Sequence, residues 1–336
     1  MAEAQFHNSH DQIPPVPDSR PQVLVIPPTM AFKLFESLFS EKFQVLKAFE
    51  SELPLHQYIA TNARSVRALI CNDIIPVNAE LLRQLPALQI AASTATGVDN
   101  IDLIECRRRG IAVTNSAGAH SEDVADMAMG LLIDVLRGVS AADRYVRSGT
   151  WKNNGDYRLG FKLSGKRVGI IGLGRIGSEV VKRLSAFGCS VSYNSRNKKP
   201  FVPYPFYSSV RELAANSDAI IVCCALTGET HHIVNKEVLS ALGKEGVIVN
   251  IGRGALVDEK ELVKCLGQGK IGGAGLDVFE NEPNVSGELF GLDNVVLSPH
   301  RAVFTPESFK AAAELVIGNL QAFFSNKPLL TSLTND

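Results

Sequence analysis

Three side chains in the second half of the chain, Arg253, Glu282 and His300, could together bind and protonate an anionic substrate. A guanidinium can hold a carboxylate through two parallel hydrogen bonds. An imidazole whose tautomer is fixed by a carboxylate can transfer a proton near neutral pH. Taken singly, each residue fits an ordinary role as an ion-pair partner, a turn residue or a satisfied loop histidine. Only their joint placement favours catalysis.

Each of these residues follows a short apolar run that predicts a β-strand. The three runs are residues 247–250, 275–278 and 295–297. In a doubly wound parallel sheet, the carboxyl ends of the strands border the ligand crevice. We therefore expect the guanidinium, the carboxylate and the imidazole to converge at one crevice.

A glycine-rich motif lies between a predicted strand at residues 168–171 and a predicted helix. It consists of Gly172, Leu173, Gly174, Arg175, Ile176 and Gly177. Gly172 permits a tight turn, Gly174 lets the backbone approach a pyrophosphate, and Gly177 allows the helix to pack closely on the strand. The helix N-terminus adds unpaired amides and the positive end of its dipole. The flanking strand and helix favour a dinucleotide site over a glycine-rich turn without a ligand.

The end of the second strand of this series indicates which dinucleotide is bound. An NAD-selective site usually has a carboxylate there for the ribose hydroxyls, but this chain has Ser195, Arg196 and Asn197. Ser195 can donate a hydrogen bond to a 2′-phosphate, and Arg196, helped by Lys198 or Lys199, can pair with it. We therefore predict that NADPH is preferred over NADH. The alternative is that these bases only solvate a surface loop.

The elements that must position these residues form two series of alternating strands and helices. The pattern predicts an α/β protein with two doubly wound parallel-sheet domains, a Rossmann cofactor domain and a flavodoxin-like substrate domain. We expect residues 21–118 and 301–336 to form the substrate-binding domain, residues 119–300 the dinucleotide-binding domain, and residues 1–20 a disordered tail. A continuous helical stretch at 121–147 should lead into the second domain. The last helix, residues 306–324, should pack back on the first.

Composition excludes several other classes of protein. The 34 Lys and Arg residues nearly balance the 35 Asp and Glu residues, so there is no cationic field for nucleic acid or an anionic membrane. The six cysteines are scattered without CxxC pairs, and we predict no metal site. No apolar run reaches the roughly 18 residues that a membrane span needs. The N-terminal residues lack a targeting pattern, so a cytoplasmic location is expected.

From about Val23 onward the chain resembles the D-isomer-specific 2-hydroxyacid dehydrogenases. The motifs that carry the resemblance are residues 97–102 (GVDNID), 172–177, 250–254 (NIGRG), 275–278 (GLDV) with Glu282-Pro283, and 298–300 (SPH). Within the family, residues 193–199 and 272–283 look like those of plant glyoxylate/hydroxypyruvate reductases and the related hydroxyphenylpyruvate reductases. The resemblance implies NADPH-dependent reduction of a small 2-oxo acid, such as glyoxylate or hydroxypyruvate, to its D-2-hydroxy acid.

The resemblance also assigns roles to individual residues. Arg253, Glu282 and His300 match the catalytic positions. The matching cofactor contacts are Leu173 to Ile176, Ser195 to Asn197, Ile251, Gly252, Arg253 and Asp277. Asp277 would meet the nicotinamide carboxamide. The family further implies a homodimer, built through the cofactor domains and the helical stretch at 121–147.

The expected substrate loop departs from the usual pattern. Relatives often offer consecutive backbone amides, with a glycine, to the substrate carboxylate, whereas this chain has Ile74, Ile75 and then Pro76, which has no amide to donate. We expect the carboxylate to depend on Arg253 and on the amides of the two isoleucines, whose bulk favours small substrates. His300 is the other residue expected to contact the substrate.

Several alternatives remain open from the sequence. Trp151 could wall the pocket or lie in the core, and Arg301 could bind anions or face solvent. The enzyme could reduce hydroxyphenylpyruvate instead of a smaller acid. A different class of function, a non-catalytic protein that senses NADPH on the same fold, is disfavoured because Arg253, Glu282 and His300 are all present.

Overall fold

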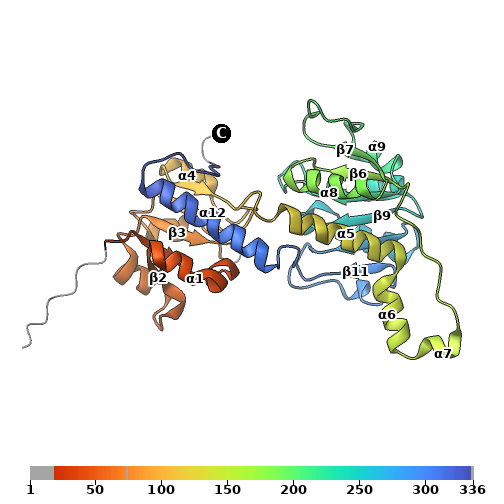
Figure 1. The fold of residues 1–336 in the computed structure, drawn as a ribbon, viewed down its shortest axis with the longest axis horizontal. Coiled ribbons are helices and arrows are strands. Elements are labelled where there is room, and N and C mark those ends of the chain that lie inside the picture. Colours follow the sequence, from red (N-terminus) through yellow and green to blue (C-terminus); the bar gives the residue numbers. More distant parts are fainter. Residues whose placement is uncertain (1–18, 73–74, 334–336) are drawn as a thin grey trace, which may run out of the picture.

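The computed structural model describes residues 19–72 and 75–333, which form two lobes, each built around a parallel sheet (Figure 1). The predicted tail falls on residues 1–20, of which residues 1–18 lie outside the described part. Helices cover both faces of each sheet, so the predicted α/β class with two doubly wound sheets is confirmed.

The five-stranded lobe contains the first half of the strand series. Its strands are β1 (Gln22–Val25), β2 (Gln44–Lys47), β3 (Ala68–Cys71), β4 (Ile90–Ser93) and β5 (Ala112–Thr114). They pair in parallel in the order β2-β1-β3-β4-β5, which is the flavodoxin-like order that the sequence predicted. Its helices are α1 (Met30–Lys42), α2 (Leu55–Tyr58), α3 (Ala79–Gln84), α4 (Leu103–Arg108) and α12 (Pro306–Phe324), with short turns η1 (Ala48–Glu50) and η2 (Ile59–Ala63).

Alternation along the strands explains the two hydrophobic layers of this lobe. Val23 and Val25 face one layer and Leu24 faces the other, because successive strand residues point to opposite faces. The first layer also holds α1 and α12, which lie side by side on the sheet (Figure 1). The last helix therefore packs back on the first sheet, as expected.

The six-stranded lobe contains the glycine-rich motif. Its strands are β6 (Arg167–Ile171), β7 (Ser190–Asn194), β8 (Ala219–Val222), β9 (Val247–Asn250), β10 (Gly273–Leu276) and β11 (Val295–Leu297). The order is β11-β10-β9-β8-β6-β7, and a single parallel bridge from Tyr193 to Phe206 stands where the Rossmann order has a third strand. Its helices are α5 (Ser121–Arg137), α6 (Val139–Arg147), α7 (Thr150–Asn154), α8 (Arg175–Ala186), α9 (Val210–Ala215), α10 (Lys236–Leu242) and α11 (Glu259–Gly267), with turns η3 (Gly254–Leu256) and η4 (Gly287–Leu289).

Two predicted elements have wrong boundaries. The strand expected at 275–278 begins and ends two residues earlier, at Gly273 and Leu276. Its glycines hide it from a pattern search, but they are needed because α5 lies against this strand: a Cβ on Gly273 would come within 2.7 Å of Val135 Cγ1.

The expected continuous helix at 121–147 is also wrong, because α5 ends at Arg137 and α6 begins at Val139. Gly138 between them adopts a left-handed backbone conformation with φ 63°, which favours glycine and ends a helix. The carboxylate of Asp134 then accepts a hydrogen bond of 2.8 Å from the backbone N–H of Ser140. Helices α6 and α7 consequently project from the lobe (Figure 1). Residues 139–161, which comprise these helices and the segment after them, are called the arm below.

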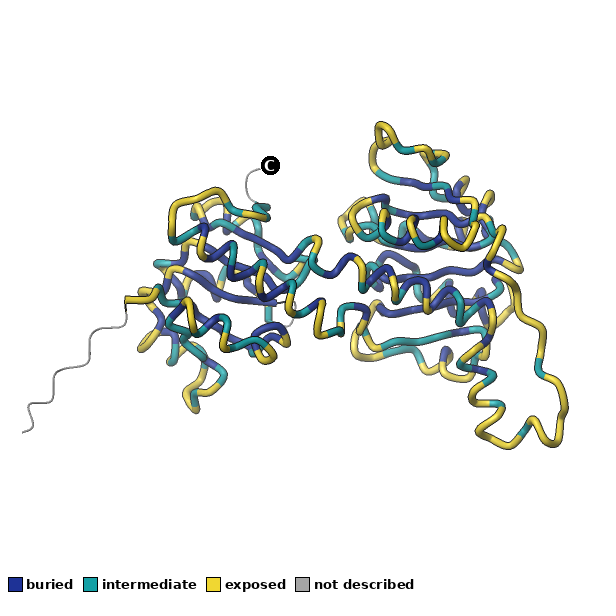
Figure 2. The backbone as a smooth tube through the Cα atoms, viewed as in Figure 1, coloured by how far each residue is buried: buried dark blue, intermediate teal, exposed yellow. Residues whose placement is uncertain are grey.

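The chain passes between the lobes twice, before α5 and before α12 (Figure 1). His120 and Ser308 connect the two passages through a hydrogen bond of 2.6 Å between Nδ1 and Oγ. Thr305 Oγ1 also donates to the carboxylate of Asp123. Most strand residues of both lobes are buried, although β2 is half-buried, whereas residues 139–161 are mostly exposed (Figure 2). The domain boundaries expected after residues 118 and 300 stay predictions.

Candidate active site

Glu282 and His300 meet at the carboxyl end of the six-stranded sheet. His300 Nδ1 lies 2.7 Å from Glu282 Oε2, which is the contact expected from the sequence. The backbone of His300 has φ 52° and its N–H donates to the carbonyl oxygen of Asp277, 2.8 Å away. The side chain is about one-third exposed, at 35%, so the ring is held from one side and accessible from the other.

Both groups of this pair have shifted pKa values. The hydrogen bond that Glu282 accepts from the imidazole raises the pKa of His300 above its usual value, against the opposing effects of burial and of the positive charge of Arg253. Burial works to raise the pKa of Glu282, but hydrogen bonds from His300 and from the backbone N–H of Phe279 outweigh it and lower that pKa. The pair therefore favours a charged imidazolium beside a carboxylate.

Arg253 follows β9 and is held in a turn that Asn250 organises. Asn250 Oδ1 accepts from the N–H of Gly252 at 3.1 Å, and its Nδ2 donates to the carbonyl oxygen of Arg253 at 2.9 Å. The guanidinium donates through Nε to Asp99 Oδ2 at 2.9 Å and through Nη1 to Gly252 O at 2.9 Å. Its charge lowers the pKa of His300, so the guanidinium lies within electrostatic reach of the imidazole.

Asp277, expected to meet the nicotinamide carboxamide, is 1% exposed and holds the loop that carries His300. One carboxylate oxygen accepts from Ser298 Oγ at 2.6 Å and from the N–H of Arg301 at 2.8 Å, and the other accepts from the N–H of Ala302 at 3.0 Å. The carboxamide contact stays a prediction. The geometry makes Asp277 a support for the position of His300.

The glycine-rich turn between β6 and α8 has the geometry that a dinucleotide needs. Gly172 has φ 99°, and a Cβ there would come within 2.6 Å of the backbone of Cys224, so this position requires glycine. A Cβ on Gly177 would lie 2.3 Å from the carbonyl oxygen of Gly172, which shows how closely the helix packs. At Gly174, by contrast, no atom of the described residues lies within 4 Å of an added Cβ. A pyrophosphate could therefore approach the amides at the start of α8.

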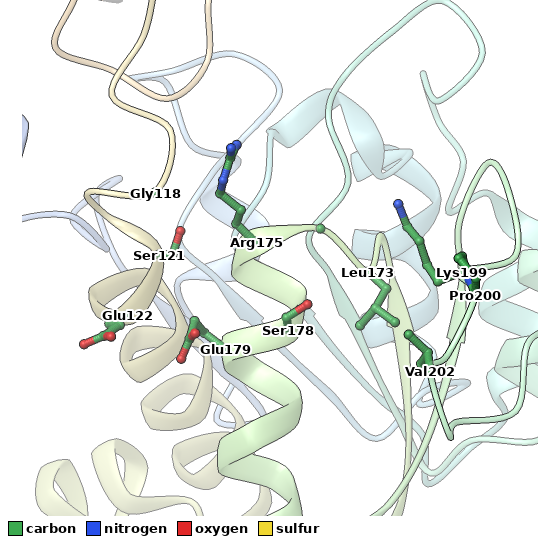
Figure 3. Close-up of a pocket in the computed structure, with 11 residues that line it drawn as sticks. Gly118, Ser121, Glu122, Leu173, Arg175, Ser178, Glu179, Lys199, Pro200 and Val202 are labelled. Atoms are coloured by element: carbon green, nitrogen blue, oxygen red, sulfur yellow. The ribbon is translucent and has the colours of Figure 1, made fainter. Parts of the chain in front are cut away.

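A cavity of about 620 Å³ opens beside this turn (Figure 3). Leu173, Gly174 and Arg175 contribute to its wall from the motif, and Lys199, Pro200 and Val202 contribute from the loop after β7. Figure 3 shows Arg175 and Lys199 on opposite sides of Leu173. Arg253, Glu282 and His300 are not among the residues that line this cavity.

The residues expected at a 2′-phosphate lie in the exposed turn just before this wall. Ser195 Oγ donates to the carbonyl oxygen of Asn197 at 2.6 Å, while Arg196 and Asn197 are exposed. Of the bases proposed to help Arg196, Lys199 lines the cavity. Ile251 is buried at the end of β9, and Gly252 lies close to Leu256 and to the carbonyl oxygen of Cys224. The loops after β6, β8 and β9 thus come together around the motif.

The substrate loop is described only in part, because Ile74 lies outside the described residues. Ile75 is half-buried, and its carbonyl oxygen accepts a hydrogen bond of 2.8 Å from Asn100 Nδ2. The same amide donates to Asn72 O at 2.6 Å. Sequence reasoning assigned no role to Asn100, Asp99 or Asn250. The signal was present, since all three lie in motifs that carried the family resemblance.

The structure gives the positions of Trp151 and Arg301, whose roles the sequence left open. Trp151 lies on α7 of the arm and is 58% exposed, so a place in the core of this chain is excluded. The guanidinium of Arg301 lies 3.8 Å from the centre of the Phe304 ring, in cation–π contact, while its backbone N–H binds Asp277. The side chain of Arg301 is therefore stacked on its own loop.

The described part of the chain contains neither a metal-binding cluster nor a membrane-spanning helix. No group of three or more His, Cys, Asp or Glu side chains there is arranged to hold a metal ion. None of the helices in the same residues combines the length and the apolar character that crossing a membrane requires. The cysteines are free, and burial raises the pKa of Cys224, beside the glycine-rich turn, to about 11.

Comparisons with known proteins agree with this geometry. The family model for "D-isomer specific 2-hydroxyacid dehydrogenase, NAD binding domain" matches residues 129–302. The chain is 55% identical to the glyoxylate/hydroxypyruvate reductase HPR3 of Arabidopsis thaliana over 95% of this chain and 99% of that protein. It is 54% identical to the hydroxyphenylpyruvate reductase of Plectranthus scutellarioides over 82% of this chain and 87% of that protein.

A solved structure shows the same fold. The NADPH-dependent glyoxylate/hydroxypyruvate reductase of Sinorhizobium meliloti, in complex with NADP and malonate, superposes with a TM-score of 0.84 and 38% identity, covering 94% of this chain and 97% of that one. The two sheets, the glycine-rich turn and the extent of these similarities lead to one assignment. The chain belongs to the D-isomer specific 2-hydroxyacid dehydrogenases and contains their NAD-binding domain.

Proposed function

We propose that this chain is an NADPH-preferring reductase that converts a small 2-oxo acid, glyoxylate or hydroxypyruvate, to its D-2-hydroxy acid. The observation that carries the proposal is the 2.7 Å contact between His300 and Glu282, within reach of the charge of Arg253 and at the strand ends beside the glycine-rich turn. Two relatives, 55% and 48% identical to this chain, are named glyoxylate/hydroxypyruvate reductases.

Each of the three residues has a defined task in this reaction. Arg253 holds the substrate carboxylate, which fixes the carbonyl carbon for attack. When bound, NADPH supplies the hydride that this carbon receives. His300 gives its proton to the carbonyl oxygen, so that the carbonyl becomes a hydroxyl, and Glu282 keeps the imidazole protonated and correctly oriented.

The test of the activity is NADPH oxidation measured with glyoxylate, hydroxypyruvate, pyruvate and hydroxyphenylpyruvate. We expect the highest kcat/KM with glyoxylate or hydroxypyruvate. Failure to turn over every one of these acids would refute the enzyme and favour a protein that only senses NADPH.

Hydroxyphenylpyruvate reduction is the second candidate, because a relative that is 54% identical bears that name. The two activities differ in the width of pocket they require. A kcat/KM at least tenfold higher for the aryl acid than for glyoxylate, a difference of about 1.4 kcal/mol, would replace our first proposal with this one.

The preference for NADPH rests on the cations after β7. No residue from 195 to 199 is acidic, and the exposed guanidinium of Arg196 is available to pair with a 2′-phosphate. Arg196→Ala should raise KM for NADPH about tenfold while changing KM for NADH less than twofold. Equal increases for both cofactors would assign Arg196 a role other than phosphate recognition.

We also propose that the arm mediates a homodimer. Val139, Val146, Trp151 and Leu159 are each more than half exposed on or beside α6 and α7, and such an apolar surface favours association. Light scattering should give the mass of two chains, and Trp151→Asp should reduce it to one. A wild-type mass of one chain at micromolar concentration would exclude this dimer. The cytoplasmic location stays a prediction.

A further inference from the structure

We propose that residues 97–100 in the five-stranded lobe position the guanidinium of Arg253 in the six-stranded lobe, with Asp99 and Gly97 as positioning residues for carboxylate binding. The proposal deepens the function given above, since it rests on Arg253 receiving the substrate carboxylate. Asp99 and Arg253 are 154 positions apart in sequence, and they meet only because the loops after β4 and β9 face each other.

The first contact fixes one edge of the guanidinium. Asp99 Oδ2 accepts from Nε at 2.9 Å, and Gly252 O accepts one hydrogen of Nη1 at 2.9 Å. Since Nε is occupied, a substrate carboxylate has the edge formed by Nη1 and Nη2 for its two hydrogen bonds. Asp99 therefore selects which edge of Arg253 faces the substrate.

The second contact fixes the plane of the guanidinium. A Cβ built on Gly97 would lie 1.8 Å from Nη2 and 2.9 Å from Cζ of Arg253. The group thus packs directly against the glycine backbone. Any side chain at position 97 must displace the end of Arg253, which is flexible, rather than the main chain. Gly97 has no left-handed backbone angle, so an alanine there would disturb the guanidinium and leave the local fold intact.

The same segment also supports the expected substrate loop. Asn100, next to Asp99, donates from Nδ2 to Asn72 O at 2.6 Å and to Ile75 O at 2.8 Å. A single short segment consequently contacts both elements expected to hold the carboxylate. The five-stranded lobe thereby influences a catalytic side chain that belongs to the other lobe.

The pair between Asp99 and Arg253 is not simply a stabilising surface ion pair. The side chains are 46% and 30% exposed, and pairs at such positions add little to stability. Variants of Asp99 should therefore fold normally, and their effect should appear in ligand binding. The chain offers a matched control in Asp218, which pairs with Arg167 at 2.7 Å at the opposite end of the six-stranded sheet.

The experiment measures the binding of oxamate, a non-reducible analogue of a 2-oxo acid, to the full-length protein saturated with NADPH, by isothermal titration calorimetry. We expect Asp99→Ala and Gly97→Ala each to raise the Kd for oxamate about tenfold, the range for losing one hydrogen bond to a charged group. Asp99→Asn should have a smaller effect, because its amide oxygen still accepts from Nε. Asp218→Asn should match the wild type, and Kd for NADPH should change less than twofold in all variants.

Three results would overturn the inference. Oxamate binding by Asp99→Ala and Gly97→Ala within twofold of the wild type would show that the segment does not position Arg253. Tighter binding by Asp99→Ala would make Asp99 a competitor of the substrate. Equal weakening of NADPH and oxamate would indicate a general structural defect.

The wild type separates this inference from the proposed function. Turnover of a 2-oxo acid without measurable oxamate binding would refute the inference and leave the function standing. Oxamate binding that depends on Asp99, without turnover of any 2-oxo acid, would support the inference and refute the function.

Discussion

The carboxyl ends of the two sheets support the site in different ways. In the six-stranded lobe, neighbours from the same sheet hold the backbone turns that carry two of the proposed catalytic residues: Asn250 shapes the turn of Arg253, and Asp277 holds the loop of His300. The five-stranded lobe contributes through Asp99, which accepts a hydrogen bond from Arg253 of the other lobe, and through Asn100, which donates to the carbonyl oxygen of Ile75 in the expected substrate loop. The difference suggests that proton transfer depends on one lobe, whereas substrate binding depends on both.

The aspartates that support the site from the two lobes, Asp277 and Asp99, also differ in burial. Asp277 is 1% exposed and its two carboxylate oxygens accept three hydrogen bonds, so its loss would leave buried donors without partners. Asp99 is 46% exposed, so in its absence water can solvate the guanidinium of Arg253 and the folded state loses little stability. Substitution of Asp277 should therefore affect kcat and stability, whereas substitution of Asp99 or Asn100 should affect mainly KM for the 2-oxo acid.

The largest expected effect is that of His300→Ala. Loss of the proposed general acid should lower kcat about 10²- to 10⁴-fold, because proton transfer to the carbonyl oxygen then depends on water. NADPH titration should give a Kd within twofold of the wild type. Comparable losses in kcat and in NADPH affinity would make His300 a structural residue and remove the distinction between the lobes.

Asp277→Asn should have the second-largest effect. We expect a fall in kcat of about 10- to 100-fold and a loss of about 1–3 kcal/mol in the free energy of unfolding. The asparagine amide would face a backbone N–H of Arg301 or Ala302, so two donors would oppose each other. Steady-state kinetics and urea unfolding measure the two quantities. Wild-type stability in this variant would contradict the supporting role of Asp277.

Glu282→Gln should change the pH dependence of reduction. Reduction needs the protonated imidazole, so the rate falls as pH rises through the pKa of His300. The hydrogen bond that Glu282 accepts from His300 raises that pKa, and loss of the carboxylate should move the fall in kcat/KM to lower pH. The reverse reaction needs the neutral imidazole, so its low-pH limit should move in the same direction. Unchanged profiles in both directions would show that Glu282 does not control the proton on His300.

The smallest effect is expected from Asn100→Ala in the five-stranded lobe. It removes two hydrogen bonds to carbonyl oxygens of the expected substrate loop, but it also removes Asn100 Oδ1, which is buried without a partner among the described residues. These changes partly offset, so we expect a stability loss of about 1 kcal/mol. KM for the 2-oxo acid should rise about threefold with kcat unchanged. A fall in kcat with constant KM would break the proposed division between the lobes.

Local patterns were sufficient for most of the fold. The strand at Val247–Asn250 and the helix at Pro306–Phe324 have the predicted limits, because apolar runs, helical spacing and caps act over a few residues. The interruption at Gly138 was readable as a glycine within a helical pattern. It was missed because the apolar residues of α5 suggested continuation. The predicted limits of strand β10 are two residues too late, because its glycines are required by the packing of α5, which lies far away in sequence.

The sequence by itself determined the fold class, the dinucleotide turn and the candidates Arg253, Glu282 and His300, since residue type and short spacing carry that information. Only the tertiary structure decided how these groups are held. The guanidinium of Arg253 is bound by Asp99, which lies 154 positions away in sequence. The backbone N–H of His300 is bound by the carbonyl oxygen of Asp277, which lies 23 positions away. Hydrogen bonds depend on distance and angle in space, and the separation of two residues along the chain does not specify either.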